Sequence, residues 1–333
     1  MAERPDVGVV LLNLGGPESL PEVEPFLVRL FSDREIIELP LGALAQPLFA
    51  RLVALVRGPA VRANYARIGG GSPQIRLTRA QGRALEERLN REASGRFRVK
   101  VAFRYWGPST EEALAALQEA GISRVVTLTL YPHYSQATTG SSENELRRVL
   151  AAPRFRGASF SVSSVSSYAI HPLYLEALAD SVRRGLDAFP EAVRPRVVLL
   201  FSAHALPQRF VDRGDPYVHE IEATRRGVLA RLRNGHRHVL GYQSRTGPVK
   251  WTGPGTDAVI DDLAREGIRE VLVVPLSFVS DHIETLYEVD MLFAERAQRA
   301  GIADYRRTEA LNTHPLFIEA LARLVEGKVG ERP

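Results

Sequence analysis

Histidine and carboxylate side chains follow two apolar segments in the second half of the 333-residue chain. His204 follows the apolar run that begins at Val197, within the motif FSAHALP, and Asp281, His282 and Glu284 follow a second apolar run. Histidine can ligate a metal or transfer a proton near neutral pH. In the absence of thiolates, three or four nitrogen and oxygen ligands suit a borderline divalent ion such as ferrous iron. The pattern therefore indicates a metal or proton-transfer site, although a lone histidine is more often structural.

Three acidic residues near this second segment have helical spacing. Asp281, Glu284 and Glu288 lie three and four residues apart, so an α-helix would place them on one face. Like charges at that spacing destabilise a helix by about 0.2–0.5 kcal/mol per pair. The spacing therefore predicts one of two arrangements. The acids either form a solvated helix N-terminus, where negative charge is favoured, or face the route of a metal ion.

The composition excludes several kinds of site. The chain has no cysteine, which rules out disulfides, thiolate zinc sites and cysteine-bound iron–sulfur clusters. The net charge is +4 and the arginines are scattered, so no nucleic-acid partner is expected. The chain has neither an apolar stretch typical of a signal peptide nor a run of about 18 uncharged apolar residues. We therefore expect a cytoplasmic protein.

Apolar, β-branched runs alternate with helical stretches along the chain. This alternation predicts an α/β fold with buried parallel strands. The expected strands are Val7–Leu12, Val125–Leu130, Val197–Phe201 and Val271–Leu276, and the expected helices include Glu111–Ala120, Leu173–Ala188 and Asp257–Glu266.

Two segments of the chain align with each other without a gap. Residues 107–135 and 253–281 share eight identities: Gly107, Pro108, Thr110, Leu117, Gly121, Ile122, Val125 and Leu130. The repeat predicts a duplicated α/β domain, with domains at 1–165 and 166–333 and a C-terminal helix that can pack back on the first. Ligands of open α/β sheets bind beyond the carboxyl ends of the strands, so we expect the active-site cleft between the domains.

Three further features bear on the ligand. LLNLGGPES and RIGGGSP lack the P-loop lysine and the G-x-G-x-x-G order, so we expect tight turns there and no nucleotide site. Residues 41–56 carry one charge and could form either a buried helix or an apolar lip over a ligand site. Aromatic residues near strand ends indicate a flat, apolar ligand, namely Tyr105, Trp106, Tyr131, Tyr134, Trp251 and Phe278.

The motifs together resemble the ferrochelatase family. In order they are LLNLGGPES, FLVRLFSDREII, YARIGGGSP, AFRYWGPST, YPHYSQATTGSS, FSAHALP, RGDPY, YQSRTGPVKWTGPGTD and PLSFVSDHIETLYEVD. The resemblance implies two similar Rossmann-like chelatase domains, each a parallel sheet flanked by helices. It also implies an enzyme that inserts Fe²⁺ into protoporphyrin IX to make protohaem, the final step of haem synthesis.

The resemblance implies roles for individual residues. His204 and Glu284 match the catalytic and metal-site pair, in which the histidine takes pyrrole protons or receives the metal. Phe278, Asp281 and His282 match the supporting loop. The porphyrin-binding positions are Leu14, Arg57, Tyr65, Ser72, Arg104, Tyr105 and Trp251. Of these, Arg57 and Ser72 match positions that meet porphyrin propionates in animal-type enzymes.

The resemblance also bears on cofactors and partners. Fe²⁺ is expected as a substrate, with no permanently bound cofactor, and the cysteine-bound cluster of the animal enzymes cannot form here. Leu14 stands where the coproporphyrin-using Firmicutes-type enzymes have tyrosine, and those enzymes lack the SRTGP pattern, so protoporphyrin is favoured over coproporphyrin III. The alternatives are a cobalt or nickel tetrapyrrole chelatase and a non-catalytic haem-binding relative. We expect a monomer that contacts a membrane or the preceding porphyrin-producing oxidase only transiently.

Overall fold

The computed structural model describes residues 6–36, 42–93, 96–157, 160–233 and 235–330. The chain forms two compact units, one of Met1–Ser167 with Phe317–Pro333 and one of Tyr168–Leu316. The domain limits expected from the sequence, 1–165 and 166–333, remain a prediction, as does the cleft between the domains. Each unit is therefore described on its own.

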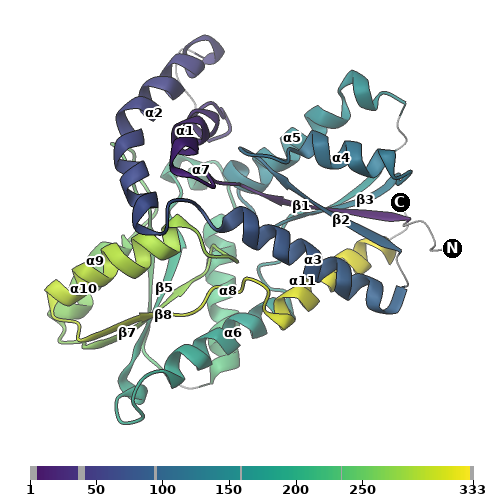
Figure 1. Ribbon diagram of the computed structural model, residues 1–333. Coiled ribbons are helices and arrows are strands. Elements are labelled where there is room, and N and C mark those ends of the chain that lie inside the picture. The colour runs from purple at the N-terminus through teal and green to yellow at the C-terminus, as the bar shows by residue number, and fades with distance from the viewer. Residues whose placement is uncertain (1–5, 37–41, 94–95, 158–159, 234, 331–333) are drawn as a thin grey trace. The chain divides into compact units, whose positions relative to one another are not determined.

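The first unit contains a four-stranded parallel sheet in the order β2-β1-β3-β4 (Figure 1). The strands are β1 (Val7–Asn13), β2 (Phe97–Phe103), β3 (Arg124–Thr129) and β4 (Ser161–Val165). In the register, Val7 pairs with Phe97 on one side and Arg124 on the other. Every residue of β1 is buried, because the strand has a neighbour on each side and helices on both faces.

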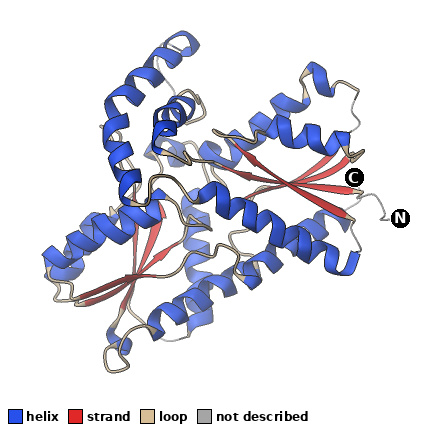
Figure 2. Cartoon of the chain, viewed as in Figure 1, coloured by secondary structure: helices blue, strands red, loops and turns tan. Residues whose placement is uncertain are grey.

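Helices cover both faces of this sheet (Figure 2). Even-numbered β2 residues face α4, as Ala102 shows by sharing a core cluster with Ala113 and Leu114. Odd-numbered β2 residues face α3, where Gly82 lies against Val99 and Val101. The helices are α1 (Val23–Phe31), α2 (Gly42–Arg67), α3 (Gln74–Ala93), α4 (Thr110–Glu119), α5 (Ser141–Leu150) and α11 (Pro315–Gly330), with short turns at Leu20–Glu22, Gln136–Gly140 and Pro153–Phe155.

The second unit repeats this topology, with a parallel sheet in the order β6-β5-β7-β8. Its strands are β5 (Val198–His204), β6 (His238–Gln243), β7 (Glu270–Pro275) and β8 (Asp304–Arg307). Its helices are α6 (Pro172–Asp187), α7 (Gln208–Asp212), α8 (Tyr217–Leu232), α9 (Thr256–Arg265), the π-helix η5 (Glu284–Phe293) and α10 (Ala294–Ala300), with a 3₁₀ turn at Arg194–Arg196. The predicted α/β class with two similar parallel sheets is confirmed.

The glycine-rich motifs form turns that require glycine. Gly15 has a φ of +87°, and a Cβ placed on it would lie 2.9 Å from the Cβ of Trp106. Gly69 and Gly70 also have positive φ, at +101° and +95°. Only glycine adopts such backbone conformations without steric cost, so backbone geometry explains these motifs.

The apolar segment 41–56 lies mostly within α2. Leu41 and the side chains of 42–44 fall outside the described residues. Further along, α2 carries a stripe of exposed apolar side chains at helical spacing, each 53–78% exposed: Leu48, Leu52, Leu55 and Val56. Of the two expected arrangements, the fully buried helix is therefore excluded. Among the described residues, no helix is both long and apolar enough to cross a membrane.

Candidate active site

Strand β5 ends at His204, so this histidine is the last residue of a buried strand. Its backbone is fixed on both sides. The His204 N–H donates to Ser277 Oγ at 2.9 Å, and the Tyr217 hydroxyl donates to the His204 carbonyl at 2.9 Å. Because β5 and β7 are neighbours in the sheet, their carboxyl ends bring His204 close to the loop after β7.

His204 and Glu284 form an ion pair at this edge. His204 Nδ1 lies 2.8 Å from Glu284 Oε2, and the side chains are 38% and 27% exposed. Desolvation disfavours charge on both groups, but their mutual attraction and hydrogen bond outweigh it. The pKa of His204 is therefore raised, and that of Glu284 is lowered to about 2. Both shifts favour the charged form of the pair, and Glu284 contacts only the Nδ1 side of the His204 ring.

Ser244 links Glu284 to a second acid. Its hydroxyl lies 3.1 Å from Glu284 Oε2 and also bonds Glu288 Oε2, while its N–H donates to Glu288 Oε1 at 2.7 Å. Desolvation and the charge of Glu284 raise the pKa of Glu288, against the hydrogen bonds from Ser244. One hydroxyl proton cannot serve two carboxylates at once. A protonated Glu288 that donates to Ser244 Oγ would satisfy all three groups and form a short proton relay toward Glu284.

Two rings from the loop after β7 pack beside this pair. Phe278 stands edge-on to His204, at a centroid distance of 6.0 Å, and to His282, at 4.2 Å. His282 is buried, and desolvation is the main cause that lowers its pKa, so its imidazole is neutral. Its Nδ1 donates to the Ser280 carbonyl at 3.2 Å. Its Nε2 has no hydrogen-bond partner in the described structure and lies 3.9 Å from Glu284 Oε2, where a cation could interact with both atoms.

The acids of this segment do not share one helical face as the spacing predicted. The π-helix η5 begins only at Glu284, so Asp281 precedes it. Asp281 instead pairs with Arg307 at 3.1 Å and accepts from Asn312 Nδ2 at 3.0 Å. Its charge is thus neutralised by Arg307, away from His204. Over the described ranges, no three His, Asp or Glu side chains form a group that could hold a metal ion.

Arg307 on β8 connects the loop before η5 to the helix itself. Besides Asp281, it binds Asp290 through two contacts of 2.7 and 2.8 Å, and it is only 11% exposed. Arg307→Met should lower the free energy of unfolding by about 2 kcal/mol, because two partly buried carboxylates lose a charged donor. Urea denaturation would measure this change. Arg299→Met, at an exposed arginine with a 3.6 Å ion pair, should cost about 0.5 kcal/mol or less, and an equal loss in both variants would contradict the assigned role.

A second polar cluster lies in the first unit, at the carboxyl end of β2. Asp33 is buried and accepts from the hydroxyls of Tyr105 at 2.6 Å and Ser141 at 2.7 Å. Arg104 Nη2 lies 2.9 Å from the same carboxylate, and its Nε donates to Ser141 Oγ at 2.9 Å. Burial and the Asp33 charge raise the pKa of Tyr105 well above its usual value, so the phenol stays neutral. Asp33 thereby fixes the positions of Arg104 and Tyr105.

The other expected porphyrin-binding residues differ in accessibility. Leu14 follows β1, and its carbonyl accepts from the Tyr105 N–H at 3.0 Å. Arg57 is exposed on α2, with its guanidinium 5.7 Å from the Phe31 ring centroid. Tyr65 and Ser72 are both buried. In the second unit, Trp251 is partly exposed and donates from Nε1 to the Thr246 carbonyl at 2.9 Å. Their roles in porphyrin binding remain predictions.

Sequence reasoning did not assign roles to four residues that hold these side chains. They are Asp33, Tyr217, Ser244 and Arg307. Three of the four lie in motifs, namely FSDREII, RGDPY and YQSRTGP, so proximity to a motif could have identified them. Arg307 lies outside every motif, and nothing in the sequence distance between Arg307 and Asp281 indicates that the two side chains meet.

Comparison with known proteins gives consistent results. A family model described as ferrochelatase matches residues 6–329. The chain is 54% identical over 331 residues to the ferrochelatase of Geotalea daltonii, covering 99% of this chain and 100% of the relative. It is 46% identical to the ferrochelatase of Synechocystis sp., covering 98% of this chain and 84% of that protein.

Solved structures show a similar fold at low sequence identity. SirB from Bacillus subtilis with Fe³⁺ matches with a TM-score of 0.57 and 12% identity, covering 98% of this chain and 96% of that chain. The sirohydrochlorin chelatase SirB from Bacillus subtilis subspecies spizizenii in complex with cobalt matches with a TM-score of 0.52 and 10% identity, covering 97% and 96%. These likenesses support the two-domain α/β architecture alone.

Proposed function

The chain belongs to the ferrochelatase family, whose members insert Fe²⁺ into a porphyrin, and we propose that its porphyrin is protoporphyrin IX and its product protohaem. We also propose His204 and Glu284 as the groups that carry the reaction. The observation that supports this choice is their 2.8 Å ion pair at the end of β5. Neither Asp281 nor any other acid of the segment lies as close to His204 among the described residues.

Metal insertion requires two pyrrole nitrogens to lose protons while a divalent cation enters the ring. His204 suits the first task, because a raised pKa makes it a stronger base than a free imidazole. Glu284 holds Nδ1, so Nε2 is the atom that accepts a pyrrole proton when the ring is neutral. The Glu284 carboxylate then stabilises the imidazolium that forms.

The second task is to attract the cation. His204 lowers the pKa of Glu284 to about 2, which favours its carboxylate form, and His282 Nε2 lies 3.9 Å from Glu284 Oε2. A carboxylate oxygen and a neutral imidazole are suitable ligands for ferrous iron. Two ligands without a closed shell hold such a substrate weakly, which suits its release to the porphyrin.

The direct test is anaerobic incubation of the protein with Fe²⁺ and protoporphyrin IX. Formation of protohaem, followed through the Soret band, is the expected result. Parallel reactions with Co²⁺ and Ni²⁺ address the other chelatase activities. Binding of porphyrin or haem without any metal insertion would overturn the proposal in favour of a non-catalytic haem-binding protein.

We expect protoporphyrin IX to be preferred over coproporphyrin III. Leu14 would offer an apolar side chain to the vinyl edge of the ring, and the resemblance implies that Arg57 and Ser72 meet two propionates. The Arg57 guanidinium is exposed, whereas Ser72 is buried. A tenfold preference in kcat/KM corresponds to about 1.4 kcal/mol of differential transition-state binding. Steady-state kinetics with both porphyrins would measure it, and a higher kcat/KM for coproporphyrin III would contradict the assignment.

A further inference from the structure

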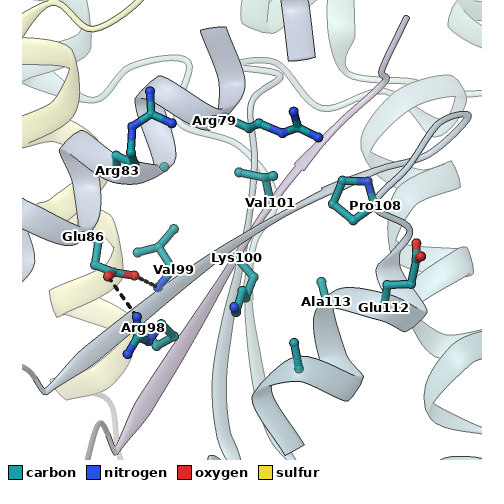
Figure 3. A pocket seen from close by; sticks show the side chains of 12 residues that line it. Arg79, Arg83, Glu86, Arg98, Val99, Lys100, Val101, Pro108, Glu112 and Ala113 are labelled. Carbon is teal, nitrogen blue, oxygen red and sulfur yellow. Dashed lines mark hydrogen bonds and ion pairs between the residues drawn. The ribbon is translucent and has the colours of Figure 1, made fainter. Parts of the chain in front are cut away.

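A groove of about 430 Å³ runs along the outer edge of β2 in the first unit (Figure 3). None of the residues that line it is one discussed above as catalytic or porphyrin-binding. Helices α3 and α4 form its sides, and the apolar groups of Val99, Val101 and Ala113 contribute to its floor. Strand β2 is the first strand of the sheet order, so one of its edges has no neighbouring strand among the described residues.

The backbone groups at both ends of this strand edge already have hydrogen-bond partners within the protein. In a parallel strand, the backbone N–H and C=O groups of successive residues point to opposite edges. The even-numbered side of β2 faces β1, as the bond from the Arg104 N–H to the Asn13 carbonyl shows, so the odd-numbered residues point their backbone groups toward the outer edge. Asn90 binds both the N–H and the carbonyl of Phe97, each at 2.9 Å. The N–H of Phe103 donates to the Pro108 carbonyl at 2.8 Å. Both ends of the edge are therefore closed to another strand.

The middle of the edge remains available. The N–H of Val99 donates to Glu86 Oε2 at 2.6 Å. In the described part of the chain, the carbonyl of Val99 and the N–H and carbonyl of Val101 have no hydrogen-bond partner within the protein. These three groups are one donor and two acceptors in a row, which is the pattern that an added β-strand of a few residues would pair with.

Positively charged side chains lie on both faces of β2 beside these unpaired backbone groups. Arg79 and Arg83 of α3 lie on the face of Val101, and Lys100 lies on the face of α4 (Figure 3). None of these three cations forms an ion pair within the described ranges. The two acids of the groove are already engaged. Glu86 binds the Val99 N–H and Arg98, and Glu112 caps the N-terminus of α4 through the Ser109 N–H.

We propose that this groove binds an extended acidic segment of a partner protein by β-strand addition to β2. Successive side chains of a strand point to opposite faces of the sheet. Two adjacent acidic residues in the segment would therefore meet Arg79 and Arg83 on one face and Lys100 on the other. The main chain of the segment would pair with Val101. The groove thus selects for adjacent acids in an extended conformation.

Lysine on an edge strand also discourages strands from pairing edge to edge. That role accounts for Lys100, which is part of β2 itself. It does not account for Arg79 and Arg83, which reach the groove from a helix, or for the closure of both strand ends around an open centre. Positive side chains from both α3 and β2 surround the unpaired backbone groups, and this arrangement favours a binding site for a negatively charged strand.

The peptide Thr-Val-Asp-Glu-Val-Thr-amide, carrying a fluorophore on its N-terminus, would test the proposal on the full-length protein by fluorescence anisotropy. We expect saturable binding that weakens as salt is added. A peptide with Ala-Ala in place of Asp-Glu should bind at least roughly tenfold more weakly, a difference of about 1.4 kcal/mol. The double variant R79E/K100E should show a similar loss, while its iron insertion and thermal midpoint stay unchanged.

Matched controls distinguish strand addition from plain charge attraction. The variant R76E/R91E makes the same charge change on exposed arginines of α3 outside the groove and should keep wild-type affinity. A peptide N-methylated at its acidic residues keeps its charge but cannot pair as a strand, so it should not bind. Equal binding of the methylated peptide, or displacement by stoichiometric inorganic pyrophosphate, would overturn the proposal, as would no binding of the acidic peptide.

Discussion

His204→Ala should abolish iron insertion and leave porphyrin binding largely intact. The side chain is removed from the end of a strand whose backbone is fixed by Ser277 and Tyr217, so the local structure should persist. What is lost is the proposed acceptor of pyrrole protons and the partner of Glu284. Loss of a general base typically costs about 10²–10⁴-fold in rate. Turnover should be measured with Fe²⁺ and protoporphyrin IX, and porphyrin affinity by fluorescence quenching without metal.

The control for this experiment is His219→Ala, at an exposed histidine of α8 in the same unit. His219→Ala should retain wild-type turnover, and this result would show that removing a histidine from elsewhere in this unit does not by itself affect activity. If His204→Ala keeps about a tenth of wild-type activity or more, the role of His204 as proton acceptor or essential ligand is wrong, because that loss is below the range for a general base.

The fold was predictable because buried strands have a strong sequence signal. Runs such as Val7–Leu12 are apolar and β-branched, and parallel strands covered on both faces need that composition. The internal repeat indicated two similar domains, and the two sheets have the same strand order. Residues at strand ends, such as His204, could be identified because the strand that carries them is easy to recognise.

Side-chain partners across the sheet could not be predicted in the same way. Asp281 and Glu284 look equivalent in the sequence, yet one pairs with Arg307 and the other with His204. The difference depends on where η5 begins and on its π-helical turns, which spacing rules for α-helices do not anticipate. The buried network around Asp33 likewise joins residues more than seventy positions apart, as with Tyr105.

Glu284 and Glu288 differ in the direction of their pKa shifts. Glu284 has its pKa lowered to about 2 by His204, so it acts as a carboxylate. The pKa of Glu288 is raised by desolvation and by the charge of Glu284, which favours its protonated form. Glutamine has the size of glutamate and resembles a protonated carboxyl group in carrying one acceptor and a donor. Because the two shifts have opposite directions, we expect the same substitution to disturb position 284 more than position 288.

Glu284→Gln should accordingly lower kcat by about 10²-fold or more, because both the partner of His204 and the charge that attracts Fe²⁺ are lost. Glu288→Gln should cost about tenfold or less, since a perturbation of one pKa unit is worth about 1.4 kcal/mol. Porphyrin affinity, read by fluorescence quenching without metal, should barely change in either variant. Equal losses in kcat would show that the two acids act through Ser244 as one unit, and a larger loss at Glu288 would place the metal-handling carboxylate one turn further along η5.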